Sequence, residues 1–355
     1  YRALVFLVIS CPCALVISIP LSYFGGIGAA SHNGILFKGA NYLDLIAKVN
    51  TVVIDKTGTL TEGVFQVQKI RSIYPEKEKM IEFAAALESK SNHPIAKAIL
   101  EYFTDIIPSD YNIAKVEEIA GHGMKGLVNG QEVLTGNSKL MKLHEIKYEQ
   151  KIDDVKETVV IVAINKEYAG YFVISDKVKK DSWNAISRLK KLGIKTTVML
   201  SGDKKSIVDD LADELNIDFA YGDLLPEDKV NHIEELKKDS DNIVVFVGDG
   251  INDAPALAIS DVGIAMGAMG SDAAVEISDV VIQTDHPSKI ATAIQIARST
   301  RAIVIQNIVF ALGVKSLIMI LGAFGIASMW EAVFADVGVS LIAILNSIRI
   351  LRKEF

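Results

Sequence analysis

The stretch that most constrains this chain is VVIDKTGTLT, which runs from Val52 to Thr61. Its first three residues are apolar and β-branched, which predicts a short buried strand. Such a strand delivers Asp55 to its carboxyl end, where open α/β sheets place their chemistry. The Lys-Thr-Gly-Thr turn that follows offers hydroxyl and backbone N–H groups that can cradle a phosphoryl group. An Asp and a Gly taken alone would more simply indicate a strand that ends in a turn.

Composition indicates a protein that lies partly in a membrane. The chain has 355 residues, of which 50% are hydrophobic, and its mean hydropathy is +0.30. This length allows two or three domains. The net charge of -7 argues against a nucleic-acid partner. The sequence opens at Tyr1 inside an apolar run without a start Met, so we expect it to lack the N-terminal part of a longer protein.

The first segment long enough to cross a bilayer is residues 1–30, which are almost uncharged. It contains the triplet Cys11-Pro12-Cys13. Pro12 removes a backbone hydrogen bond and is expected to open the helix locally. Two thiolates beside freed carbonyls suit soft ions such as Zn²⁺, Cd²⁺, Pb²⁺ or Cu⁺, and not Ca²⁺ or Mg²⁺. The simpler alternative is two small apolar cysteines around a helix kink.

Two further spans are expected at residues 303–324 and 329–348, joined by a short turn. Basic residues flank this pair, which places both ends in the cytoplasm by the positive-inside rule. Each span holds an ionisable residue, Lys315 or Asp336, and charges inside a membrane are functional candidates by default. The alternative is that both side chains reach toward a membrane surface. We predict that Asp336 joins the two cysteines as a metal ligand and that Lys315 can pair with it.

Residues 65–169 are polar and read as an insertion, because strand-rich sequence resumes at residue 171. A predicted helical stretch is interrupted at His93-Pro94, although a lone His before Pro is usually an ordinary helix N-terminus. Gly121 and Gly123 would let the backbone approach a ligand closely, but a single Gly-x-Gly is weak evidence. The sequence GxxxxGK[ST] does not occur, so a nucleotide would have to be held in another way.

A second chemical signature, GDGINDAPAL, follows the apolar strand expected at residues 243–247. Asp249 would lie at the end of a strand next to Asp55, and the two carboxylates could share a Mg²⁺ ion. Lys229, in Pro-Glu-Asp-Lys, could supply a cation for a phosphate, but taken alone it would be a solvated surface lysine.

These motifs together resemble those of the heavy-metal-transporting P-type ATPases of type IB, over essentially the whole chain. DKTGTLT resembles the phosphorylation signature, Cys-Pro-Cys the ion-binding triplet, and Ser-Asn-His-Pro the nucleotide-domain motif. The resemblance implies an α/β fold, with a haloacid-dehalogenase-like, doubly wound phosphorylation domain, an inserted α+β nucleotide-binding domain and transmembrane α-helices. The implied domains are a transmembrane helix with the metal site (1–30), the phosphorylation domain (31–64 and 170–290), the nucleotide domain (65–169) and two transmembrane helices (303–324 and 329–348).

The resemblance also implies roles for individual residues. The catalytic residues would be Asp55, Lys56, Thr57 and Lys229. The nucleotide-binding residues would be Glu88, His93, Gly121, Gly123, Asn137, Ser201, Gly202 and Asp203. The Mg²⁺ ligands would be Asp55, Thr57 and Asp249, with Asn252 and Asp253 supporting the phosphate site. The residues for the transported ion would be Cys11, Cys13 and Asp336, with Lys315 as the counter-charge.

Position 57 predicts a long-lived intermediate. Related phosphohydrolases usually carry a second Asp there as general acid and base, and Thr57 cannot shuttle protons near neutral pH. An aspartyl phosphate on Asp55 should therefore persist while a pump changes conformation.

The membrane motifs favour one subgroup. An intramembrane Lys followed by Asp336-Val-Gly looks like the zinc, cadmium and lead exporters, whereas the Tyr-Asn and Met-Ser-Ser patterns of the copper(I) subgroup are not found. Two thiolates and one carboxylate leave a single negative charge around a divalent ion, which Lys315 could neutralise, and two around Cu⁺. The implied function is ATP-driven export of Zn²⁺, Cd²⁺ or Pb²⁺ through an aspartyl phosphate, and the charge count does not rank these three ions.

The implied surroundings are a bacterial cell membrane, ATP, Mg²⁺, and the N-terminal helices and actuator domain of the same pump. The pump is expected to be a monomer and to bind no nucleic acid. Three alternatives are a Cu⁺ exporter, a soluble phosphatase of the same superfold and a non-enzymatic metal sensor. A phosphatase would need an Asp at position 57 and no membrane spans. A sensor would not need Asp55, Lys229 and Asp249 together.

Overall fold

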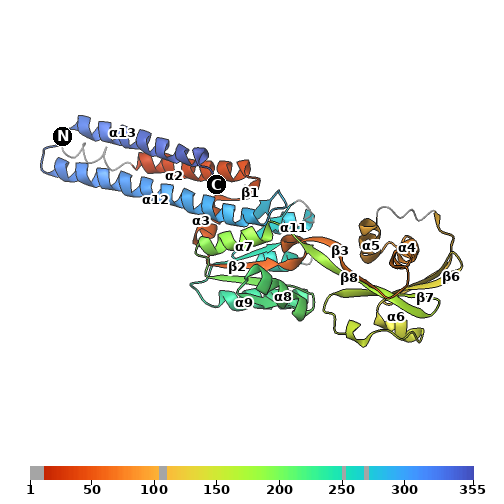
Figure 1. The fold of residues 1–355 in the computed structure, drawn as a ribbon. Coiled ribbons are helices and arrows are strands. Elements are labelled where there is room, and N and C mark those ends of the chain that lie inside the picture. Colours follow the sequence, from red (N-terminus) through yellow and green to blue (C-terminus); the bar gives the residue numbers. More distant parts are fainter. Residues whose placement is uncertain (1–11, 104–109, 250–252, 268–271) are drawn as a thin grey trace. The chain divides into compact units, whose positions relative to one another are not determined.

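The computed structural model describes residues 12–103, 110–249, 253–267 and 272–355, which form two compact units (Figure 1). The first unit comprises residues 1–60, 180–203 and 208–355, and the second comprises residues 61–179 and 204–207. Each unit has its own sheet. The α/β class expected from the sequence, with long apolar helices, is confirmed.

The first unit is built on a seven-stranded sheet in which neighbouring strands run parallel, except at one edge where β1 is antiparallel to β13. Three adjacent strands near the centre, β11, β2 and β9, are apolar and almost fully buried, as expected for parallel strands covered on both faces. The order of strands is β1 (Ile35–Phe37), β13 (Val280–Ile282), β12 (Val262–Met266), β11 (Val244–Gly248), β2 (Thr51–Asp55), β9 (Thr196–Leu200) and β10 (Phe219–Tyr221).

The predicted strand before Asp55 is confirmed as β2, and Asp55 is its last residue. Ile54 pairs in register with Val247 of β11, so these two strands end at the same edge of the sheet. The helices of this sheet domain are α3 (Ala40–Lys48), α7 (Ser182–Lys191), α8 (Lys205–Leu215), α9 (Pro226–Lys237), α10 (Ala254–Ile259) and α11 (Asp272–Ile277).

The second unit is an antiparallel six-stranded sheet with helices packed on it. Its strand order is β3 (Thr61–Ser72), β8 (Glu167–Val178), β7 (Thr158–Ile164), β6 (Gln131–Gly136), β5 (Gly123–Val128) and β4 (Ile113–Ile119). Its helices are α4 (Lys77–Glu88), α5 (Pro94–Tyr102), α6 (Ser138–Leu143) and a 3-10 turn at Gln150–Ile152.

The boundaries of this unit correct the expected insertion at 65–169. The apolar run that begins at Tyr171 was expected to return the chain to the parallel sheet, but it belongs to β8 and pairs with β3. Both faces of β8 are covered, because Phe172 and Ile174 pack with one core of the unit while Tyr171 and Val173 pack with another. A strand buried on both faces has the same continuous apolar pattern in either kind of sheet.

Three helices are long and apolar enough to cross a membrane: α2 (Cys13–His32), α12 (Ser288–Ala323) and α13 (Met329–Ile348), which continues as a 3-10 turn at Arg349–Arg352. They lie side by side in Figure 1. Helix α2 starts directly after Pro12. Helix α12 starts at Ser288, well before the span expected from residue 303, and its 36 residues measure about 54 Å at 1.5 Å per residue.

The extra length of α12 packs against the sheet domain. Arg298 donates to the carbonyl oxygens of Ala47 and Val49 at 3.3 Å each, at the C-terminal end of α3. It also donates to the carbonyl of Leu192, which ends α7. A guanidinium group satisfies helix-terminal carbonyls well, because it carries five N–H donors and a positive charge. One side chain thus joins α12 to the helices that precede β2 and β9.

Farther along α12, Asn307 is buried among the three membrane helices, with 1% of its surface exposed. Its Nδ2 donates to Ser347 Oγ at 3.0 Å and to the Ala343 carbonyl at 3.2 Å, both in α13. Its Oδ1 accepts from Asn346 Nδ2 at 2.9 Å. On α2, Ser22 Oγ lies 2.8 Å from Ser347 Oγ. The network is uncharged and holds the three helices in register.

We predict that Asn307→Leu destabilises the helix bundle by about 1 kcal/mol, the scale of interhelical hydrogen bonds in membranes. The midpoint of thermal unfolding in detergent should fall by a few degrees relative to wild type. Ser316→Leu, which changes an exposed polar residue of the same helix, is the control and should leave the midpoint unchanged. Equal midpoints for the two variants would refute the role given to Asn307.

Candidate active site and ion site

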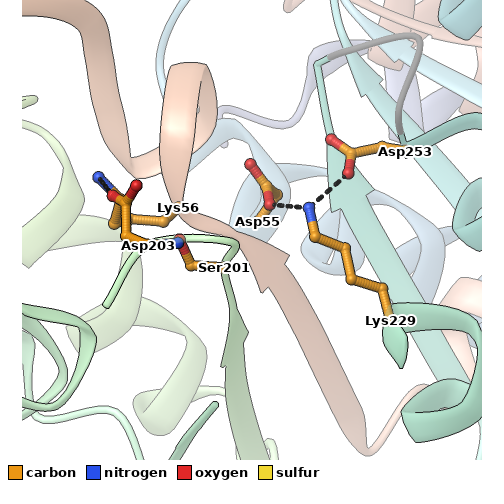
Figure 2. A network of polar contacts seen from close by, with 6 residues as sticks. All are labelled: Asp55, Lys56, Ser201, Asp203, Lys229 and Asp253. Atoms are coloured by element: carbon orange, nitrogen blue, oxygen red, sulfur yellow. Dashed lines mark hydrogen bonds and ion pairs between the residues drawn. The ribbon is translucent and has the colours of Figure 1, made fainter. Parts of the chain in front are cut away.

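The centre of the first unit is an ion-paired cluster around Asp55 (Figure 2). Lys229, in the first turn of α9, places its Nζ 2.5 Å from Asp55 Oδ1 and 2.8 Å from Asp253 Oδ1. Asp253 directly precedes α10. All three side chains are buried. The sequence prediction that Lys229 supplies a cation at this position is consistent with the geometry, and the surface-lysine alternative is wrong because only 8% of the residue is exposed.

A third carboxylate reaches the same place from the end of β11. Asp249 packs so closely on Gly58 that a Cβ added at Gly58 would lie 1.6 Å from Asp249 Oδ2. Gly58 also has φ +73°, a left-handed conformation that glycine adopts without strain. Carboxylate oxygens of Asp55, Asp249 and Asp253 lie within 4.8 Å of one another. Three hard oxygen donors and one ammonium leave a net negative charge, which fits Mg²⁺.

Burial and neighbouring charges both shift the pKa values of the cluster. Burial of the carboxyl group, reinforced by the negative charge of Asp253 and opposed by Lys229, raises the pKa of Asp55 to about 7. The pKa of Lys229 is raised, since the attraction of Asp55 and Asp253 outweighs the effect of its burial. Burial and the neighbouring carboxylates thus favour the protonated form of Asp55, and the two carboxylates favour the charged form of Lys229.

The predicted residues Ser201, Gly202 and Asp203 lie in the cavity that contains Asp55, which has a volume of about 330 Å³. Ser201 Oγ accepts a hydrogen bond from the Asp203 amide at 3.1 Å. Lys56 is directed to Asp203, with Nζ 2.5 Å from Oδ2, and not to Asp55 (Figure 2). Neither this ion pair nor its position was predicted from the sequence. Thr57 lines the same cavity with an exposed side chain.

The other predicted nucleotide-binding residues come together in the second unit. A cavity of about 250 Å³ is lined by Glu88, His93, Gly121, Gly123 and Asn137. Sequence reasoning did not assign five other lining residues. Ser91 and His122 lie inside the quoted motifs, whereas Glu118, Thr135 and Thr158 belong to none. The two cavities share no lining residue, so the eight residues predicted to bind nucleotide are divided five to three between them.

Two of these residues also have local structural roles. His93 is the N-cap of α5, and its Nδ1 accepts from the amide of Ile95 at 3.3 Å. Asn137 caps α6, and its Nδ2 donates to the carbonyl of Gly121 at 2.9 Å. The simpler interpretation of His93 as a helix N-terminus is therefore correct. The same residue also lines the cavity.

At Gly123 the backbone of β5 comes too close to β6 for any side chain. Its φ is +140°, and an added Cβ would lie 2.2 Å from the carbonyl oxygen of Thr135. Glu88 lies in the same cavity with 6% of its surface exposed. Burial raises the pKa of the Glu88 carboxyl group to about 7. The buried carboxyl group of Glu88 therefore changes its charge near neutral pH.

In the membrane helices, Lys315 Nζ lies 2.8 Å from Asp336 Oδ1. Both line a small hollow between α12 and α13 with Val314 and Val339. The same two valines pack with Ala14, which follows Cys13 at the start of α2. This places Cys13 near the level of the Lys315–Asp336 pair. Cys11 and Asn252, which were also predicted to be site residues, lie outside the described residues.

Comparison with known proteins gives consistent matches. Residues 49–261 match the family model of haloacid dehalogenase-like hydrolases. The chain is 53% identical to a cadmium, zinc and cobalt-transporting ATPase of Bacillus subtilis (strain 168), over 100% of this chain and 50% of that protein. It is also 53% identical to a zinc-transporting ATPase of Synechocystis sp. (strain ATCC 27184 / PCC 6803 / Kazusa), over 99% of this chain and 48% of that protein.

A solved structure shows the same similarity. The crystal structure of a zinc-transporting PIB-type ATPase in the E2.Pi state superposes with a TM-score of 0.89 and 34% identity, covering 99% of this chain and 58% of that chain. The chain therefore spans about half the length of the relatives it matches.

The buried Glu88 predicts a measurable pH dependence of stability. Its pKa is raised from 4.5 to about 7 on folding, so the protonated form stabilises the folded state below pH 4.5, and this contribution is lost as pH rises through 7. Glu88→Gln cannot ionise at position 88. It should therefore flatten the decline in the free energy of unfolding with rising pH, which amounts to about 3 kcal/mol at most in the wild type. Thermal unfolding between pH 5 and pH 8 measures it, in the absence of nucleotide.

The control is Glu118→Gln, which removes an exposed carboxyl group from the same cavity. It should keep the wild-type decline. A Glu88→Gln profile that parallels wild type would show that Glu88 does not titrate in this range.

Proposed function

The chain belongs to the heavy-metal-transporting P-type ATPases, and on this premise we propose that it carries the phosphorylation, nucleotide-binding and ion-binding residues of a pump that uses ATP to export Zn²⁺, Cd²⁺ or Pb²⁺. The observation that carries the proposal is the contact of Asp55 with Lys229 inside a cluster of three aspartates. The pump would lie in a bacterial cell membrane. Its remaining helices and an actuator domain would be supplied by sequence outside this chain.

In the proposed reaction, an oxygen of the Asp55 carboxylate attacks the γ-phosphorus of ATP. The new O–P bond forms as the bond from the γ-phosphorus to the bridging oxygen breaks, and ADP leaves. Lys229 offsets negative charge next to the attacking carboxylate, because its ammonium is already 2.5 Å away. Mg²⁺ held by Asp55, Thr57 and Asp249 would screen the incoming phosphate. Asp253 positions Lys229 through their ion pair.

The aspartyl phosphate should be long-lived. Position 57, next to the nucleophile, carries a Thr whose hydroxyl is not a proton shuttle near pH 7. The Ser201–Asp203 turn lies in the same cavity and would contact the nucleotide's phosphates through its hydroxyl and amide groups. In the second unit, the cavity with His93 and Glu88 would bind the rest of the nucleotide.

For the transported ion, we propose the thiolates of Cys11 and Cys13 with the carboxylate of Asp336. The 2.8 Å contact of Lys315 with Asp336 supports a role for Lys315 as an internal counter-charge. The metal ion and the ammonium group then compete for one carboxylate, so that binding one favours release of the other. A divalent ion leaves the loaded site closer to neutral than Cu⁺ does, which matters in a medium that penalises charge.

The first test concerns the nucleophile. Asp55→Asn should abolish acid-stable, hydroxylamine-sensitive labelling of the full-length protein by [γ-³²P]ATP, because an amide is not a nucleophile in this reaction. Asp239→Asn, an exposed residue outside the cavity, should label as wild type does. Persistent label on Asp55→Asn would refute the assignment. Label that turns over in the absence of a membrane and of metal ions would favour a phosphatase.

The second test separates the ion site from the nucleotide site. In the full-length protein, Asp336→Ala should abolish ATPase activity stimulated by Zn²⁺ or Cd²⁺ and leave nucleotide affinity unchanged. His93→Ala should have the opposite pattern. It should weaken ATP binding by about 1–2 kcal/mol, the scale of a lost hydrogen bond, and leave metal binding unchanged. ATPase assays ion by ion decide the subgroup: stimulation by Cu⁺ and not by Zn²⁺, Cd²⁺ or Pb²⁺ would overturn the proposed substrate.

A further inference from the structure

The ends of two membrane helices enclose a basic cavity that the proposed ATPase cycle does not use. It measures about 560 Å³ and lies between the part of α12 near Arg298 and the end of α13. Four of its eight lining residues are cationic: Arg298, Arg349, Arg352 and Lys353. We propose that this cavity binds the headgroup of an anionic phospholipid from the cytoplasmic leaflet.

The positive charges of the cavity are not neutralised by the protein. No acidic residue is among those that line it, and in the described part of the chain none of the four cations forms a salt bridge within 4.0 Å. Arg298 uses its donors on backbone carbonyls, which leaves its charge in place. In a chain with a net charge of -7, four like charges around one hollow favour an anion.

Two of the cations are held in position by neutral partners. Lys353 Nζ donates to Ser299 Oγ at 2.8 Å, which ties the end of the chain to α12. Arg349 Nη1 donates to Asn346 Oδ1 at 2.7 Å. Each of these contacts uses one donor of a group that has several, and both side chains remain exposed. The cations are therefore preorganised and still able to donate to phosphate oxygens.

The surface next to the cavity is suited to acyl chains. Ala302 and Ile303 form part of the cavity wall. About two turns farther along α12, Val309 is 66% exposed, and one turn before Arg349 on α13, Leu345 is 59% exposed. Residues three or four apart share one face of a helix. Each helix thus presents a charged group followed by apolar side chains on one side. A lipid, with its charged headgroup and apolar acyl chains, fits this surface, whereas a soluble phosphate does not.

Depth in the membrane also supports this assignment. Between Arg301 and Lys315 α12 carries no charged residue, and between Asp336 and Arg349 α13 carries none. The four cations therefore lie where the apolar parts of both helices end, at the side that carries the sheet domain through the first turns of α12. Anionic headgroups of the cytoplasmic leaflet occupy this depth, and each nearby Lys or Arg strengthens their binding about fivefold at physiological salt.

The test measures lipid binding to the full-length protein, stripped of lipid in detergent and analysed by native mass spectrometry. The probes are phosphatidylglycerol and phosphatidylcholine with identical acyl chains. Wild type should retain phosphatidylglycerol in preference to phosphatidylcholine. Arg349→Gln with Arg352→Gln should weaken phosphatidylglycerol binding at least about tenfold, since two cations are removed, and leave phosphatidylcholine binding unchanged.

Two control pairs make the result specific. Lys48→Gln with Lys191→Gln removes the same charge from exposed positions of the same unit, outside the cavity, and should bind phosphatidylglycerol as wild type does. Arg349→Lys with Arg352→Lys keeps the charge and should retain most of the affinity. Because this pair is as perturbing to packing as the glutamine pair, it separates lost charge from lost structure.

Three results would overturn the proposal. Equal binding of the two lipids by wild type would show no anionic preference. An equal loss in the Lys48/Lys191 pair would indicate general electrostatics. Displacement of phosphatidylglycerol by millimolar inorganic phosphate would identify a site for soluble anions and not for lipid.

Discussion

The ion pair between Lys229 and Asp55 constrains where the surrounding elements of the first unit must lie. Burying an ammonium group among carboxylates is costly unless every charge has a close partner, so three separate elements must meet within hydrogen-bonding distance. The parallel register of β2 with β11 brings Asp55 and Asp249 to one sheet edge. The N-terminal turn of α9 supplies Lys229, and the segment before α10 supplies Asp253. The surplus of negative charge that remains favours a divalent cation.

The same sheet is mechanically connected to the membrane helices through α12. Arg298 binds carbonyl groups next to the start of β2, while Asp55 stands at the other end of this strand. Lys315 lies 17 residues farther along the helix, about 26 Å away at 1.5 Å per residue. One continuous helix therefore contacts the segment that leads into the strand ending at Asp55 and also carries Lys315, which pairs with Asp336. A change of charge at either end can be transmitted by displacement of a rigid element, without a flexible linker.

Site residues could be predicted from the sequence where they lie in contiguous motifs. They could not be predicted where the interacting partners are distant in the chain. Asp55, its strand and the second signature with Asp249 could be located because motif and strand pattern coincide. The ion pair of Lys56 with Asp203 joins positions that are 147 residues apart, and no local sequence pattern predicts it. The boundary of the second unit was misplaced, because β8 is covered on both faces like a parallel strand. Tertiary contacts, and not propensity, decided both cases.

Within the membrane helices, polar groups are divided between two levels with different chemistry. The Asn307 network is neutral, largely buried and built from amide and hydroxyl groups. Eight residues farther along α12, about 12 Å, Lys315 and Asp336 are charged and partly exposed. Amide and hydroxyl oxygens are poor ligands for soft metal ions, whereas thiolate is a good one. Helix register can therefore be fixed at the first level without creating a competing ion site. We propose that the second level, beside Cys13, is where a metal ion exchanges against an ammonium group.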